Sequence, residues 1–257
     1  HQWTAYLGDW WKADFVGLEI FGDVLGDPRF YWALVRSLIF AASSTVLSLL
    51  IGFTLAYLMR EPFRGRGLFY LLFITPMLVV PVSIGYTYEM LLVQKGPFNQ
   101  LLSWITGQEI QVSWFAERIP AFLSIIFIEV WNWTPFVFIL MLAGLSGMPK
   151  EPIEAARVLG ASPLQIFFHV QLPLLRPVIL LALILRFLEA LGEYPKVWSL
   201  TRGGPGSYTE TMPVYLYIMS WEHFNISKAA AVSYLTLVVV AAIVYICIRI
   251  LLREKRA

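Results

Sequence analysis

Four long runs of this 257-residue sequence contain no charged residue, and each is about as long as a helix that crosses the hydrocarbon core of a bilayer. The runs are 37–59, 67–88, 130–149 and 229–248. A fifth apolar stretch, 174–200, carries charged residues that include Arg186, Glu189, Glu193 and Lys196. Because lipid tolerates only structures that satisfy every backbone polar group internally, the runs predict an all-α polytopic membrane protein with five transmembrane helices.

The distribution of basic residues predicts how these helices are oriented. Ten of the 19 Lys and Arg residues lie in segments 60–66, 147–176 and 249–257, whereas six lie in the longer segments 1–31, 94–118 and 202–228. The positive-inside rule assigns the first group to the cytoplasm and the second group to the outside. The outer segments are also rich in Trp and Tyr, as an interfacial aromatic belt is.

The expected organisation is one membrane domain with short ends. We expect an external segment over 1–31, a transmembrane domain over 32–252 with a cytoplasmic segment at 149–173 and an external loop at 202–228, and a cytoplasmic tail over 253–257. No span or cleavable signal precedes the external segment, which begins at His1, so we expect one further helix upstream. The lone Cys247 and three scattered histidines predict no disulfide framework and no metal site.

Prolines and spacing add two local expectations. The second apolar run contains Pro76, Pro81 and Gly85, which predict a kinked helix that faces protein and whose freed carbonyls are satisfied by neighbouring helices or by water. The segment 94–118 is long enough for a small interfacial helix.

The stretch EPIEAARVLGASPLQIFFHVQLP, residues 151–173, has strong local helix signals. Pro152 suits a first helical turn, and Gly160 suits a C-terminal stop. Ser162 and Gln165 have the spacing of a capping box that starts a second helix. Two short helices joined by a glycine–alanine hinge predict a compact elbow on the cytoplasmic surface. Capping physics alone leaves an ordinary ordered loop equally open.

The same stretch resembles a known motif. Glu154-Ala155-Ala156, then Gly160, and then Val170, Leu172 and Pro173 at fixed spacing resemble the coupling motif of permease subunits in ATP-binding-cassette (ABC) importers. The segments FVGLEIFGDVLGDPRFYWALVRSL and LTRGGPGSYTET resemble the sugar-importer branch of the maltose-transporter type. The resemblance covers about residues 15 to 252, and it departs at Leu159, where many relatives have Asp.

The resemblance implies a type I ABC importer permease fold and a set of partners. The elbow would dock in a cleft of an ATPase subunit through Glu154, Ala155, Ala156, Gly160, Ala161, Leu172 and Pro173. A loop of Gly203, Gly204, Pro205 and Gly206 would contact an external solute-binding protein. A second permease subunit, an ATPase dimer and membrane lipid would complete the assembly in a bacterial or archaeal plasma (inner) membrane, without nucleic acid.

No enzyme motif appears in this chain. The sequence lacks the phosphate-binding pattern G-x-x-x-x-G-K-[ST], so we expect ATP and Mg to be bound by the partner ATPase and no cofactor to be bound here.

Intramembrane polar residues predict a substrate path, because ionisable groups in hydrocarbon usually face a cavity or a partner. Arg186, Glu189 and Glu193 fall on one helical face, where they either line the path or form an internal Arg186–Glu189 pair. Glu89 and Glu129 are expected to be interfacial. By position in maltose-type relatives, substrate contacts would come from the residues before Pro135 and from Glu193. The candidates before Pro135 are Asn132, Trp133 and Thr134, and Trp133 has packing or the aromatic belt as its alternative role.

These features together predict a permease subunit of an ATP-driven, binding-protein-dependent importer of a sugar, oligosaccharide or polyol that works by alternating access. One alternative is an ion-coupled secondary transporter that uses Glu189 or Glu193, which would predict internal repeats that we do not find. An intramembrane enzyme with paired carboxylates is a second alternative, without a supporting motif. For the substrate, glycerol and glycerol phosphate stay open.

Overall fold

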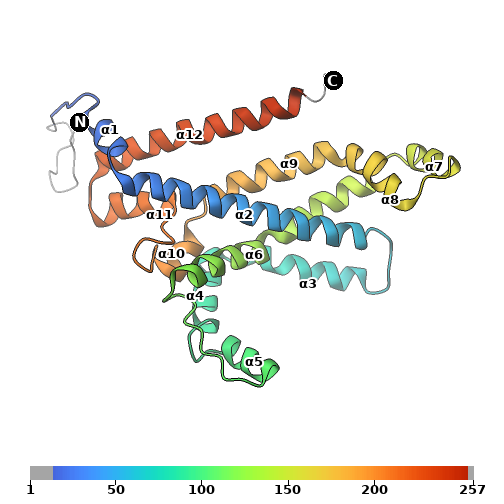
Figure 1. The fold of residues 1–257 in the computed structure, drawn as a ribbon, viewed down its shortest axis with the longest axis horizontal. Coiled ribbons are helices and arrows are strands. Elements are labelled where there is room, and N and C mark those ends of the chain that lie inside the picture. Colours follow the sequence, from blue (N-terminus) through green and yellow to red (C-terminus); the bar gives the residue numbers. More distant parts are fainter. Residues whose placement is uncertain (1–13, 254–257) are drawn as a thin grey trace. The chain divides into compact units, whose positions relative to one another are not determined.

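The computed structural model describes residues 14–253, and every regular element in that range is a helix (Figure 1). The expected all-α class is confirmed. Residues 1–13 of the expected external segment and 254–257 of the tail lie outside the described residues. The elements are α1 Glu19–Leu25, α2 Pro28–Leu58, α3 Arg66–Leu78, α4 Pro81–Leu91, α5 Pro97–Thr106, α6 Arg118–Ser146, α7 Glu151–Val158, α8 Pro163–Ile166, the π-helical turn η3 Phe167–Gln171, α9 Leu172–Leu191, α10 Pro195–Thr201, α11 Met212–Tyr217, the π-helical turn η4 Ile218–Glu222 and α12 Ile226–Arg253.

Helices stand at all five positions where spans were expected. By length and composition, α2, α6 and the Ile226–Ile246 part of α12 qualify as membrane spans, and α3 with α4 makes a fourth if the interrupted pair counts as one span. The fifth position is α9, a helix of 20 residues that is more polar because it contains Arg176, Arg186 and Glu189.

The second expected span is interrupted between α3 and α4. Val79 and Val80 adopt extended backbone conformations, with ψ angles of 136° and 128°. Pro81 explains the break, since a proline has no N–H to donate and pushes the preceding residue out of the helical region. The expected kink is therefore a complete break in the helix.

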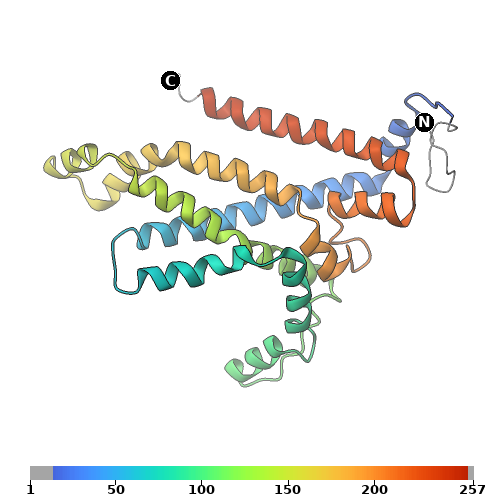
Figure 2. The same cartoon turned by 180° about the vertical axis from the view of Figure 1, so that it is seen from behind.

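The described chain forms two compact units. Unit 1 comprises residues 14–41, 80–126 and 191–253, and unit 2 comprises residues 42–79 and 127–190. Each unit is described separately below. In unit 2, both ribbon views show the short helices α7 and α8 between the end of α6 and the beginning of α9 (Figures 1 and 2).

The core of unit 2 depends on small residues that let helices approach closely. Ala56, Val137, Phe138, Met141 and Ala182 form its fully buried centre. A Cβ atom placed on Gly52 of α2 would lie 2.9 Å from Cβ of Val137 on α6, so the two helices touch through the backbone at this point. Close approach through glycine is a common way to pack helices in membranes, where dispersion and not the hydrophobic effect holds them together.

Unit 1 is held by polar contacts that join the start of α2 to α11 and α12. Asp27 accepts hydrogen bonds from Nζ of Lys228 at 2.9 Å and from the hydroxyl of Tyr215 at 3.1 Å. Arg29 donates two hydrogen bonds to the buried carboxylate of Glu210, at 2.9 and 2.6 Å. These contacts connect residues more than 180 positions apart and fix the expected external loop against the first span.

The segment 94–118 contains the expected small helix, α5, and is organised around one amide. The side chain of Asn99 donates to the carbonyls of Gln94 and Val112, each at 2.8 Å, and accepts a hydrogen bond from Nε1 of Trp114 at 2.9 Å. Three hydrogen bonds of this buried amide close the segment on itself.

We predict that Gly52→Ala destabilises the protein by about 1–3 kcal/mol, because the added methyl group overpacks the α2–α6 contact. Thermal unfolding of the purified protein in detergent would measure the effect. Gly67→Ala is the matched control, since a Cβ at Gly67 meets nothing within 4 Å. Equal unfolding temperatures for both variants would contradict the close contact.

We also predict that Asp27 makes stability depend on pH. Burial alone would raise the pKa of Asp27, but the hydrogen bonds from Lys228 and from the backbone N–H of Arg29 lower it below its ordinary value. A carboxyl with a lowered pKa stabilises the fold above its unfolded pKa of about 3.9, and this stabilisation is lost as the pH falls through the folded value. Asp27→Asn should therefore unfold at a lower temperature near neutral pH and lose less stability on acidification, whereas the exposed Asp23→Asn should behave like the parent protein.

Candidate functional site

The elbow of unit 2 begins with α7, a helix that begins and ends where the sequence predicts. Pro152 lies in the first turn, and the helix gives way at Leu159 to Gly160, whose φ of 81° is a left-handed conformation that favours glycine. The N–H of Gly160 donates to the carbonyl of Arg157 at 2.9 Å, and the N–H of Ala161 donates to the carbonyl of Ala156 at 3.0 Å. The predicted glycine stop is confirmed.

The second arm of the elbow is α8, with the predicted capping box. Ser162 Oγ accepts a hydrogen bond from the backbone N–H of Gln165, and Gln165 Oε1 accepts one from the backbone N–H of Ser162 at 2.8 Å. The turn η3 then continues into α9. Phe167 in η3 packs against Phe53 and Tyr57 of α2, which fixes the elbow to the helical core of unit 2.

The tip of the elbow exposes large apolar side chains. Val158, Leu159 and Leu164 are 88%, 86% and 69% exposed. The predicted coupling residues are accessible too: Glu154, Ala155, Gly160 and Pro173 are exposed, and Ala156, Ala161 and Leu172 are half-buried. The tip therefore presents an uncovered surface of apolar and small residues.

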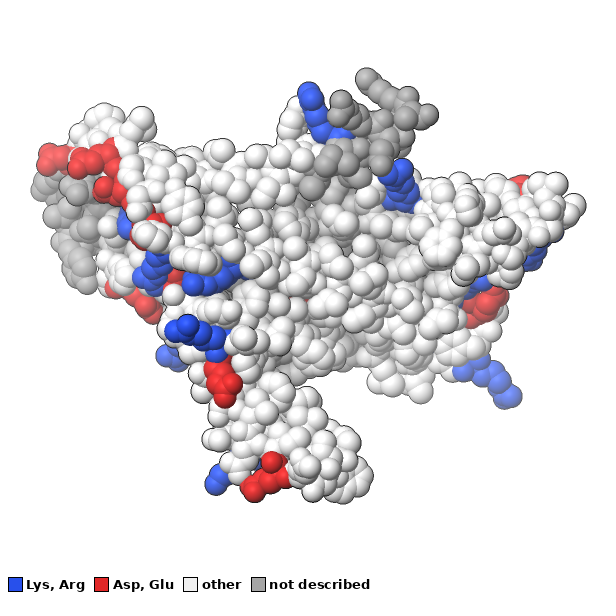
Figure 3. Space-filling model, viewed as in Figure 1, with Lys and Arg blue, Asp and Glu red and all other residues white. Residues whose placement is uncertain are grey.

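A polar cavity of about 310 Å³ lies beside this tip. Its lining includes Arg60 and Glu61 from the α2–α3 turn and Lys150, Glu154 and Arg157 from the beginning of the elbow. Figure 3 shows acidic and basic side chains gathered over this end of unit 2. The elbow thus combines an apolar tip with a charged flank.

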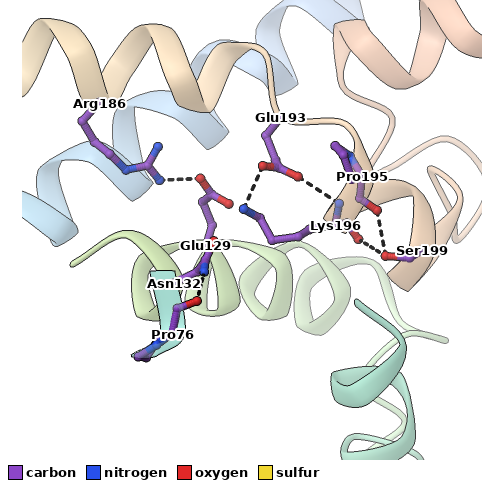
Figure 4. A network of polar contacts seen from close by, with 8 residues as sticks. All are labelled: Pro76, Glu129, Asn132, Arg186, Glu193, Pro195, Lys196 and Ser199. Carbon is purple, nitrogen blue, oxygen red and sulfur yellow. Dashed lines mark hydrogen bonds and ion pairs between the residues drawn. The ribbon is translucent and has the colours of Figure 1, made fainter. Parts of the chain in front are cut away.

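A buried ion pair lies in the helical part of unit 2. Arg186 of α9 donates through Nη2 to Oε1 of Glu129 on α6 at 2.5 Å, and the two side chains are 1% and 0% exposed (Figure 4). The expectation that Glu129 is interfacial is wrong, and so is the internal Arg186–Glu189 pair, because Glu189 is exposed while Arg186 faces α6. The partner of Arg186 was missed because it lies 57 residues away in the sequence.

The three candidates before Pro135 have different roles in the structure. Asn132 donates to the carbonyl of Pro76 at 2.6 Å, close to the α3 break (Figure 4). The guanidinium of Arg186 lies 5.4 Å from the ring centre of the half-buried Trp133. Thr134 turns its hydroxyl to its own helix and donates to the carbonyl of Val130. Trp133 and Arg186 are therefore adjacent, whereas Thr134 is occupied within α6.

In unit 1, Glu193 forms a second buried ion pair. Its Oε2 lies 2.8 Å from Nζ of Lys196, and its Oε1 accepts the backbone N–H of Lys196 at 2.9 Å. Because α9 ends at Leu191, Glu193 lies in the connection to α10, and the expected helical stripe through Glu193 is wrong. The following helix is fixed by close packing, since a Cβ on Gly85 of α4 would lie 1.7 Å from Ser199 Oγ.

An aromatic group stands beside this second pair and was missed from the sequence. The rings of Tyr194 and Trp198 stack at 5.9 Å, and Trp198 lies 4.5 Å from the ring of Tyr217. Tyr194 and Trp198 are four residues apart, a spacing that places two side chains side by side on a helix and could have been recognised in the sequence. Tyr217 belongs to a different helix, so only the structure identifies the third ring.

The glycine-rich loop after α10 is internally braced. Gly203 and Gly206 have φ angles of 85° and 62°, which explains the need for glycine. Thr209 donates through Oγ1 to the carbonyl of Gly204 at 2.7 Å. Gly203 is buried, Gly204 and Pro205 are half-buried, and only Gly206 of the four predicted contact residues is exposed.

Comparisons with known proteins agree with these features. The family model described as "Binding-protein-dependent transport system inner membrane component" matches residues 45–253. The protein named "Probable ABC transporter permease protein y4oQ" of Sinorhizobium fredii is 36% identical over 90% of this chain and 74% of its own length. The "Trehalose/maltose transport system permease protein MalF" of Thermococcus litoralis is 32% identical over 93% of this chain and 80% of its own length.

A solved structure supports the fold. A chain of a bacterial ABC transporter involved in the import of the acidic polysaccharide alginate superposes with a TM-score of 0.82, at 22% identity, over 95% of this chain and 86% of that chain. The expected type I importer permease fold is confirmed, and the ion-coupled alternative is not favoured. The chain belongs to the family of binding-protein-dependent transport system inner membrane components, the permease subunits of ABC importers.

Proposed function

We propose that this chain is the permease subunit of an ATP-driven importer for a sugar, oligosaccharide or polyol, and that it works by alternating access. Its partners would be a second permease subunit, an ATPase dimer that binds ATP and Mg, and an external solute-binding protein that reaches the loop around Gly206. The site of action would be a bacterial or archaeal inner membrane. Family membership and the sugar named for the Thermococcus litoralis relative support this class.

The exposed tip of the elbow carries the proposal. Val158, Leu159 and Leu164 lie on a segment whose backbone is tied by a capping box and by the Gly160 turn, so their exposure is not a consequence of disorder. Uncovered apolar side chains on an ordered surface mark a protein interface. The charged flank with Glu154 and Arg157 would orient a partner, while the apolar tip enters its cleft.

Charge balance favours a neutral solute. Arg186 is paired with Glu129, and Lys196 is paired with Glu193, so neither buried cation is in excess. Glycerol phosphate would require an unbalanced cation, and these pairs therefore favour a sugar or polyol. The carboxylates of Glu129 and Glu193 are held in ion pairs, which supports an ATP-driven transporter over one that moves protons through Glu193.

Unit 2 offers a suitable contact surface for a sugar. The half-buried indole of Trp133 would meet the apolar face of a sugar ring. Nε and Nη1 of Arg186 make no hydrogen bond to any residue that the structure describes, and they would donate to hydroxyl groups. A transport site suits a small number of strong contacts, because a solute that binds there must also be released.

We predict that Leu159→Asp prevents the ATPase subunit from binding, because the tip would have to bury a carboxylate. Co-purification of the ATPase should fall at least tenfold, which corresponds to about 1.4 kcal/mol. Thermal unfolding of the permease itself should change little, since Leu159 supports no contact in the core.

The control for this prediction is Arg64→Asp, which adds an acid to the exposed α2–α3 turn outside the elbow. It should leave co-purification close to the parent level. Normal ATPase binding and uptake in Leu159→Asp would refute the docking role of the elbow.

We further predict that Trp133→Ala weakens uptake by roughly threefold to tenfold, because an aromatic contact contributes about 0.5–1.5 kcal/mol. The measurement is uptake of trehalose and of maltose into proteoliposomes that contain the assembled importer and its cognate binding protein. Trp131→Ala, in the same helix but on a different face, is the matched control. An equal loss of uptake in both variants would assign Trp133 a packing role. It would not contradict the proposal that the chain is an importer permease.

A further inference from the structure

A cavity of about 310 Å³ lies within unit 1, between the N-terminal part of α2, the beginning of α6 and the external loop after α10. We propose that this cavity binds the phosphate headgroup of an anionic phospholipid in the outer leaflet. Two arginines would hold the phosphate, and an acyl chain would lie along the apolar face of α2. On the face drawn in Figure 3, basic side chains gather over the beginnings of α2 and α6, with acidic ones beside them.

The two arginines are Arg36 of α2 and Arg118 at the start of α6. Among the residues that the structure describes, neither guanidinium forms an ion pair. Glu210, the acid near Arg36, has both carboxylate oxygens bound by Arg29, at 2.9 and 2.6 Å, and the acid next to Arg118 in the sequence is the exposed Glu117. Nη1 of Arg36 is buried and makes no hydrogen bond within the described chain.

Such a site favours an anion, because the half-buried Arg36 keeps one buried guanidinium nitrogen without a hydrogen-bond partner in the described chain, and the exposed Arg118 adds a second positive charge. Two guanidinium groups match the geometry of a phosphate, which accepts paired hydrogen bonds from arginine. The cavity volume is also within the range of small-ligand pockets.

The aromatic lining places the cavity at the boundary between membrane and water. The indole of Trp32 is 59% exposed, and the guanidinium of Arg36 lies 5.9 Å from its ring centre. Tyr208 of the external loop meets Phe122 of α6 edge-on at 6.1 Å. Trp and Tyr side chains are enriched at the level of lipid headgroups, where their polar and apolar parts are both satisfied.

The aliphatic lining distinguishes a lipid from a soluble anion. Val35 and Ile39 are 40% and 53% exposed, line the cavity, and belong to the membrane span α2. A phosphate ester without acyl chains would leave these side chains uncovered. A water-soluble partner would not reach them in the hydrocarbon. A cationic end and an apolar end together fit an anionic amphiphile.

The test uses the assembled importer, purified with lipids of defined composition and analysed by native mass spectrometry. With phosphatidylglycerol as the probe, we expect one retained lipid that phosphatidylcholine does not replace. Arg36→Gln and Arg118→Gln should each weaken retention roughly fivefold, since each basic residue contributes a similar increment of lipid affinity. Arg36→Lys should retain more lipid than Arg36→Gln, and Arg64→Gln, which changes an exposed arginine of unit 2, should match the parent protein.

Three results would overturn the proposal. If phosphatidylcholine is retained as well as phosphatidylglycerol, the negative charge of the headgroup does not determine binding. Displacement by soluble glycerol 1-phosphate at a matched concentration would assign the site to a soluble anion. If the Arg36→Gln and Arg118→Gln variants keep the lipid but lose the second permease or the binding protein, the arginines belong to a protein interface.

Discussion

Hydrocarbon offers no hydrogen-bond partners, so polar groups within the apolar helices of this chain are costly unless another part of the protein satisfies them. In unit 2 the amide of Asn132 satisfies the Pro76 carbonyl beside the α3 break, and Glu129 neutralises Arg186. In unit 1 the hydroxyl of Ser37 accepts the backbone N–H of Met212 at 2.6 Å. These contacts decide which helices are neighbours, since moving any of them would leave a polar group in lipid.

The sequence was sufficient for features that depend on a few adjacent residues. The elbow followed from Pro152, Gly160 and the Ser162–Gln165 box, because capping is settled within one helical turn. The prolines of the second span predicted a kink there, and the structure has a complete break before Pro81. The five helical positions followed from the length of the apolar runs, and the family resemblance extended these local features to a whole fold.

The long-range ion pair could not be predicted from the sequence, and the end of α9 was predicted too late in the chain. Nothing in the neighbourhood of Arg186 identifies Glu129 as its partner, since the pairing depends on how α6 and α9 pack. Pro195 is the local signal for the boundary at Glu193, since proline is favoured in the first turn of a helix and Pro195 begins α10. With Glu193 placed in the connection to α10, its ion pair with Lys196 becomes a bond between neighbours across a helix start.

The π-helical turn η3 sets the rotational phase of α9. Each residue of a helix turns the chain by roughly 100°, and a π turn holds one residue more than an α turn. The one extra residue of the π turn Phe167–Gln171 therefore rotates the side chains of α9 about the helix axis relative to those of α8. Removing one residue there would rotate the whole of α9 about its axis and carry Arg186 off the side that meets α6, although no residue of the ion pair had been changed.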